Sequence, residues 1–163
     1  MRLALAFTAT VLATTPALAR DSLGMFETWG AFRDPGVPRC YAIAQADHAA
    51  KAKADYRAYA DIGQWPRRGL RNQVHFRLSK RVAGNVPIRL RVDTQDFVLV
   101  GGGGDAWAAD RRMDATIVAA MRSAKAMQVR ARALDGGLID DRYPLPGAAS
   151  AIDAAALGCA AAR

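Results

Sequence analysis

Long hydrophobic runs are missing from most of this 163-residue chain. Beyond residue 19, no stretch approaches the roughly 18 apolar residues that a membrane-spanning helix needs. Aromatic residues make up only 7% of the chain, and few lie beside its arginines, so no stacking platform for nucleic acid is indicated. No cluster of His, Cys and Asp has the spacing of metal ligands. We therefore expect no membrane-spanning segment, no nucleic-acid partner, no metal site and no cofactor.

Motifs of nucleophilic catalysis are also missing. No serine lies in a G-x-S-x-G sequence, and none is followed three residues later by lysine. His48 falls in a predicted surface loop, whereas His75 lies between arginines on the polar face of a predicted strand, a setting that disfavours a protonated imidazole. The glycines 101–104 lack the tight strand–turn–helix of a dinucleotide site and indicate a flexible hairpin loop. We predict no enzyme; a hydrolase with an unrecognised site is the alternative.

The first nineteen residues have the pattern of a secretory signal peptide. Arg2 supplies a short positive region, residues 3–12 are mostly apolar, and Ala17–Ala19 forms an A-x-A cleavage site. We therefore expect cleavage after Ala19 and export to a bacterial periplasm or beyond. The mature chain, residues 20–163, has the length of a single domain.

The mature chain contains two cysteines and has a positive net charge. Cys40 and Cys159 are an even pair in an oxidising compartment, which predicts one disulfide; two buried thiols are the alternative. The net charge is +8, and removal of Arg2 with the signal peptide leaves +7. Such an excess steers a protein towards anionic partners such as lipopolysaccharide, acidic polymers or phospholipid head groups, although it also serves solubility alone.

Hydrophobic periodicity predicts an α+β fold dominated by antiparallel sheet, either sandwich-like or a partly closed barrel of about seven or eight strands. Asp110 or Asp114 is the candidate N-cap of the first helix, and Ser150 with Asp153 forms a candidate capping box in the second. The expected strands cover 25–32, 39–45, 56–62, 70–79, 86–92, 97–100, 127–133 and 138–145, and the expected helices lie near 110–124 and 147–159.

The tryptophans are expected in two environments. Trp29 and Trp107 lie within or beside predicted strands, so we expect them to pack in the core. Trp65 precedes Pro66 and two arginines in a predicted loop, so we expect it to be exposed and available for recognition.

Arginines on the polar faces of three predicted strands form the candidate binding site. If these strands share a sheet, their guanidinium groups make a basic surface that can bind phosphate or carboxylate. The alternative is a solvated sheet face on which arginine opposes edge-to-edge aggregation. The candidate residues are Arg71, Arg77, Arg89, Arg91, Arg130 and Arg132.

Three segments carry a family resemblance: FETWGAF at 26–32, RCYAIA at 39–44, and DRYPLPG at 141–147 before the helix that contains Cys159. Together they resemble the invasion-associated locus B family of small exported alphaproteobacterial proteins, over nearly the whole mature chain. Better-known members carry further cysteines, so this chain resembles a divergent subgroup. The resemblance implies a non-enzymatic, β-rich exported protein that binds an envelope or host-surface partner. A periplasmic stress protein that binds polyanions is the alternative.

Overall fold

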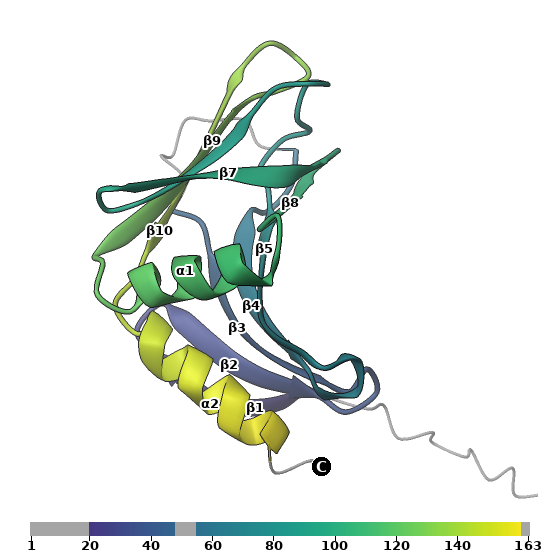
Figure 1. The fold of residues 1–163 in the computed structure, drawn as a ribbon, viewed down its shortest axis with the longest axis vertical. Helices are drawn as coiled ribbons and strands as arrows, with labels where there is room; N and C mark the ends of the chain where they lie inside the picture. The colour runs from purple at the N-terminus through teal and green to yellow at the C-terminus, as the bar shows by residue number, and fades with distance from the viewer. Residues whose placement is uncertain (1–19, 48–54, 161–163) are drawn as a thin grey trace, which may run out of the picture.

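Residues 20–47 and 55–160 are described by the structure, a computed structural model, so the predicted signal peptide and His48 lie outside it. Ten strands form one antiparallel sheet in the order β1-β2-β3-β4-β5-β8-β7-β6-β9-β10. Figure 1 shows that this sheet is strongly curved, with both helices on its inner side. The strands are β1 (Asp21–Phe26), β2 (Trp29–Asp34), β3 (Arg39–Gln45), β4 (Tyr59–Trp65), β5 (Leu70–Arg77), β6 (Ile88–Val92), β7 (Gln95–Gly102), β8 (Asp105–Trp107), β9 (Ala126–Arg132) and β10 (Leu138–Pro144).

The predicted α+β class with two helices is confirmed, but the expected number of strands was too low. The single strand expected over 25–32 is a hairpin, because the chain turns between β1 and β2 at Glu27, whose φ is +53°. The hairpin predicted at glycines 101–104 is present, but Gly101 and Gly102 belong to β7, so only Gly103 and Gly104 form the turn into the short strand β8. The sheet is single, unlike a sandwich, and it is not closed by pairing between β1 and β10.

The helices α1 (Arg111–Met121) and α2 (Ala148–Ala160) begin in different ways. Asp110 caps α1, since its side chain accepts a hydrogen bond of 2.8 Å from the Met113 N–H, as predicted. The capping box expected in α2 was wrong, because the helix begins at Ala148 and Ser150 therefore lies inside it. Within the described part of the chain, no helix is long and apolar enough to cross a membrane.

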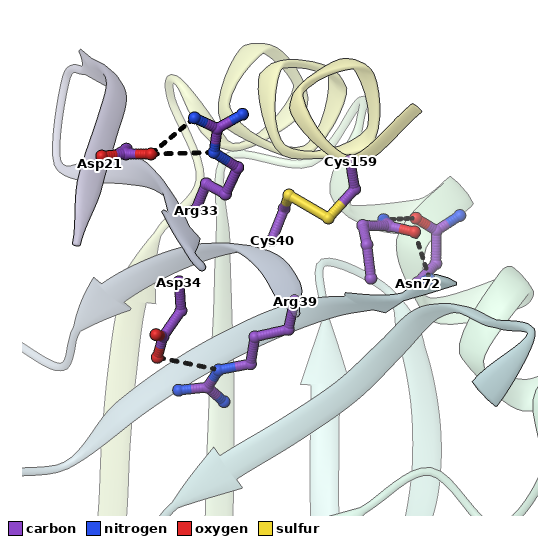
Figure 2. The surroundings of a disulfide bond; sticks show 8 residues. Asp21, Arg33, Asp34, Arg39, Cys40, Asn72 and Cys159 are labelled. Atoms are coloured by element: carbon purple, nitrogen blue, oxygen red, sulfur yellow. Dashed lines mark hydrogen bonds and ion pairs between the residues drawn. A yellow bond between two sulfur atoms is a disulfide. The ribbon is translucent and has the colours of Figure 1, made fainter. Parts of the chain in front are cut away.

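The second helix is attached to the sheet by the predicted disulfide. Cys40 of β3 and Cys159 of α2 are bonded, with Cα atoms 5.7 Å apart and a sequence separation of 119. Figure 2 shows the bond bridging the end of α2 to the strand beneath it. One face of α2 packs on the sheet, since Ala148, Ile152 and Ala155 are buried with Cys159. The helix therefore covers the inner side of β1–β4.

Curvature brings the far end of the sheet back towards its beginning. The buried Trp29 of β2 donates a 2.8 Å hydrogen bond from its indole N–H to the carbonyl of Pro144, where β10 ends. The N–H of Asp47 similarly donates to the carbonyl of Arg142, over 2.7 Å. Gly147 completes this contact with a φ of +88°, and a Cβ there would lie 2.0 Å from the carbonyl oxygen of Phe26. The inner face is thereby enclosed, whereas neither of the two described helices lies on the outer face.

Two buried carboxylates accept hydrogen bonds from backbone N–H groups in and just after β5. The three-residue strand β8 pairs only with residues 75–77 of β5. Beyond one end of this pairing, the N–H of Val74 donates to Asp114 of α1 over 2.8 Å. Beyond the other end, the N–H of Ser79 donates to Asp141 of β10 over 2.9 Å. Such partners avoid the cost of a buried unsatisfied amide, and they give Asp114 a structural role in place of the predicted cap.

Candidate functional site

Two rows of side chains run across the outer face of four neighbouring strands, β7, β6, β9 and β10. Their alignment follows from the strand register, which sets the residues directly opposite one another. The first row is Val98, Arg89, Arg130 and Asp140; the second is Asp96, Arg91, Gln128 and Arg142. We call the four arginines in these rows the arginine face: Arg89, Arg91, Arg130 and Arg142.

Four guanidinium groups of the arginine face are accompanied by two carboxylates within the same rows. Arg91 donates two hydrogen bonds to Asp96, at 2.8 and 2.7 Å, and these hold the pKa of the Asp96 carboxyl below its ordinary value. Arg142 contacts both oxygens of Asp140, at 3.2 and 3.1 Å, and lowers the pKa of that carboxyl. The four arginines and two carboxylates together therefore have a net charge of +2.

Arg89 and Arg130 face one another directly across the β6–β9 pairing. Arg130 lies 3.7 Å from a carboxylate oxygen of Asp140. The side chain of Arg89 makes no hydrogen bond or ion pair with any residue that the structure describes, although its charge helps to lower the pKa of Asp96. Like charges placed directly opposite on a sheet destabilise it. This pair is therefore a cost to the fold that an anion bound between the two guanidinium groups would offset.

Two adjoining hollows lie on the arginine face. A hollow of about 140 Å³ is lined by Arg89, Arg91, Asp96, Gln128 and Arg130. A second hollow, of about 380 Å³, shares Arg91 and Gln128 with the first and adds Arg142 and Lys125. Guanidinium groups at the rim of a hollow can bind a phosphate or carboxylate through paired N–H donors. The arrangement therefore has the chemistry of an anion site.

The structure brings together some of the predicted arginines and separates others. Arg132 lies on the same face of β9, at the hairpin end, where it donates to the carbonyl of Gly136 over 2.9 Å. Arg77 lies two strands beyond β7 and is held by Asp105, with an N–O distance of 2.6 Å. Arg71 lines a different hollow, of about 350 Å³, beside Cys159. Arg71 and Arg77 are thus not part of the arginine face.

Arg142 belongs to the arginine face but was not among the predicted site residues. Its signal was present in the sequence, because Asp140 and Arg142 alternate with Ile139, Asp141 and Tyr143 in an extended segment. The alternating residues Ile139, Asp141 and Tyr143 are buried, as a strand with one inner face requires. What the sequence did not reveal is that β10 pairs with β9 and so aligns Arg142 with Gln128.

A second polar cluster lies on the outer face around His75 of β5. Its Nδ1 lies 3.0 Å from Asp61 of β4 and its Nε2 lies 3.1 Å from Asp105 of β8. The ring stacks on Trp107, with centroids 5.0 Å apart, and meets the edge of Tyr59. Because both ring nitrogens contact carboxylate oxygens, both can donate only when the imidazole is protonated.

The prediction that this setting disfavours a protonated His75 was wrong. Burial acts to lower the pKa of His75, but the hydrogen bonds and charges of Asp61 and Asp105 outweigh it and raise the pKa above its ordinary value. The prediction counted Arg71 and Arg77 as neighbours, whereas cross-strand pairing places Asp61 directly opposite His75 and Asp105 opposite Arg77. A histidine engaged at both nitrogens has no free lone pair with which to act as a general base.

The raised pKa of His75 predicts that stability falls with rising pH. The contribution is fully present below the unfolded pKa of about 6.5 and is lost as pH rises through the higher folded pKa. At pH 6, H75Q should lower the free energy of unfolding by about 1 kcal/mol, since the charged hydrogen bonds are partly solvent-screened. Denaturant unfolding between pH 6 and pH 9 measures the difference.

R77Q is the matched control, because Arg77 bonds the same Asp105 but stays charged throughout this pH range. Its effect on the free energy of unfolding should be independent of pH. The account of His75 is contradicted if the gap between the wild type and H75Q stays constant or widens as pH rises.

Exposed apolar side chains lie between the arginine face and the His75 cluster. Val98 and Val100 of β7 are 52% and 48% exposed, and Val100 lies directly opposite Trp107, which is 36% exposed. The continuous apolar run at 97–100 suits a central strand, and β7 is an interior strand of the sheet; of these four side chains, however, only Leu99 is fully buried. Trp107 was expected in the core; it lies on the outer face instead.

Trp65, expected to be exposed, lies at the end of β4 between two cations. The Arg39 and Arg68 guanidinium carbons lie 5.3 and 5.0 Å from the centroid of its ring. Cation–π contacts of this kind occupy the aromatic surface that a ligand would need. The predicted recognition role of Trp65 therefore has weaker support than that of the arginine face.

Comparison with known proteins adds no assignment: the chain matches no family model, no curated protein and no solved structure. The residues described by the structure also contain no group of three or more His, Cys, Asp or Glu side chains placed to hold a metal ion. The function of the chain must therefore be argued from its own side chains.

Proposed function

We propose that this protein acts in the cell envelope as an exported, non-enzymatic binding protein, and that its arginine face binds an anionic ligand. The observation that carries the proposal is the direct opposition of Arg89 and Arg130 beside a hollow. A surface that served only solubility would gain nothing from placing two like charges opposite one another. An anion that accepts hydrogen bonds from both guanidinium groups would turn this repulsion into attraction.

The wider assignment has independent support from the chain. The disulfide between Cys40 and Cys159 is typical of proteins that leave the reducing cytoplasm, which supports export. The hydrogen-bonded state of His75 supports binding in preference to hydrolysis, because neither ring nitrogen is free. We also propose membership of a divergent subgroup of the invasion-associated locus B family, on the segments that resemble it.

A titration with soluble polyphosphate, a polyanion without apolar groups, tests the proposal. The wild type should bind, with an affinity that falls as salt concentration rises. The triple variant R89Q/R91Q/R130Q should bind between roughly tenfold and a hundredfold more weakly, because each cation near an anionic surface contributes up to about 1 kcal/mol. Calorimetry at several salt concentrations measures both effects.

The triple variant R81Q/R111Q/R112Q is the matched control. It removes the same number of positive charges from exposed positions outside the arginine face. Its affinity for polyphosphate should remain close to that of the wild type. Equal losses in the two triple variants would mean that net charge alone attracts the polyanion, and the proposed site would be rejected.

A further inference from the structure

The exposure of two valines on β7 is not explained by binding of an anion to the arginines. β7 is an interior strand of the sheet, paired with β6 on one side and β8 on the other. Both helices pack on the inner side of the sheet, so among the described residues no helix covers the outer face of β7. Val98, Val100 and Trp107 form a continuous apolar strip there, through the pairing of Val100 with Trp107.

This apolar strip adjoins the arginine face directly. Val98 lies opposite Arg89 in the β6–β7 pairing, and Arg89 lies opposite Arg130 in the next pairing. One row of the sheet therefore passes from an exposed apolar side chain to two guanidinium groups. A soluble polyanion would contact the guanidinium groups and gain nothing from the valines.

An anionic lipid bilayer presents both of the chemistries that this row matches. Its phosphates lie at the level of the head groups, where arginine binds them, and its acyl chains begin a few ångströms deeper. Tryptophan suits this boundary because its ring is apolar and its N–H is polar. Branched side chains beside arginines can enter the boundary while the guanidinium groups stay with the phosphates.

We propose that the ligand of the arginine face is the surface of a bilayer containing anionic phospholipid, and that Val98 and Val100 enter it. This inference rests on the proposed anion-binding function and names its partner. Charge complementarity selects an anionic surface, and the apolar strip beside the arginines selects a lipid surface over a soluble polymer. The protein would lie on the bilayer with the outer face of strands β7, β6 and β9 towards the lipid.

Co-sedimentation with vesicles tests this inference, using phosphatidylcholine with and without phosphatidylglycerol. The wild type should sediment with the phosphatidylglycerol vesicles and remain in solution with phosphatidylcholine alone. V98T/V100T keeps every charge and the β-branched shape, yet it should bind the anionic vesicles between roughly threefold and tenfold more weakly. Its affinity for soluble polyphosphate should be unchanged.

The control variant V37T/L157T removes two other exposed apolar side chains, 50% and 71% exposed, at positions away from β7. It should bind the vesicles as the wild type does, and thermal unfolding verifies that both variants are folded. Wild-type affinity of V98T/V100T for vesicles overturns the inference, as does failure of the wild type to bind them. If polyphosphate binding persists in either case, the proposed anion-binding function stands; its loss would reject that function as well.

Discussion

Reduction of the Cys40–Cys159 disulfide should lower the free energy of unfolding by roughly 2 to 5 kcal/mol, a large share of the stability of a domain of this size. The bond joins residues separated by 119 positions, so it closes a loop that spans most of the mature chain. Restriction of the unfolded chain by a loop of this length contributes about 5 kcal/mol in the chain-entropy model, and measured values are often lower.

The position of the bond suggests which part of the fold loosens first. Helix α2 packs on β1–β4 mainly through small side chains, since Ala148, Ala151 and Ala155 are buried beside Ile152. Alanines bury little apolar area each, so this interface has a smaller hydrophobic contribution than one built from leucine. The bond to Cys40 at the far end of the helix therefore secures an interface that is weak for its length (Figure 2).

Equilibrium unfolding in denaturant, with and without reductant, measures the effect. The double variant C40A/C159A is the control, because it should have the lower stability in both conditions and show no response to reductant. Equal denaturation midpoints for oxidised and reduced wild type would contradict this account of the disulfide.

Replacement of Trp29 by alanine should cost about 3 to 5 kcal/mol in the free energy of unfolding. Trp29 is completely buried, and its indole N–H bonds the carbonyl of Pro144, at the opposite end of the strand order. The substitution leaves a large cavity and an unsatisfied carbonyl where the curved sheet approaches itself. W29F removes the N–H donor and only part of the ring, so it should show a smaller loss than W29A.

W107A is the matched control for Trp29, since Trp107 lies on the outer face and is 36% exposed. It should cost no more than about 1 to 2 kcal/mol, mostly through its stacking on His75. Thermal or denaturant unfolding of the three variants measures the ranking. An equal loss in W29A and W107A would contradict the assignment of Trp29 to the core.

Much of the fold could be predicted from hydrophobic periodicity, and the errors in that prediction have local causes. The spacing of Ile117 and Met121, four residues apart, is typical of one face of a helix, and both side chains are buried in α1. The N-terminal hairpin was missed because its turn at Glu27 lacks the glycine or asparagine that favours a positive φ. The apolar run of β7 agrees with its interior position in the sheet, but such a run does not reveal whether helices cover both faces.

The candidate site was harder to predict, because it depends on which strands are neighbours. Alternation correctly placed Arg89 and Arg130 on outward faces, but their direct opposition follows from pairing of β6 with β9, which are separated by α1 in the chain. The carboxylates around His75 were missed for the same reason. Asp61 and Asp105 come from β4 and β8, so no local pattern around the histidine contains them.

The most direct test of the proposed arginine face is nuclear magnetic resonance of the arginine side chains during titration with polyphosphate. The account predicts that the Nε–Hε signals of Arg89, Arg91 and Arg130 shift together and saturate at the same polyphosphate concentration. The signals of Arg111 and Arg112 should stay in place. Shifts confined to Arg111 and Arg112, or spread evenly over all the arginines of the chain, would contradict it.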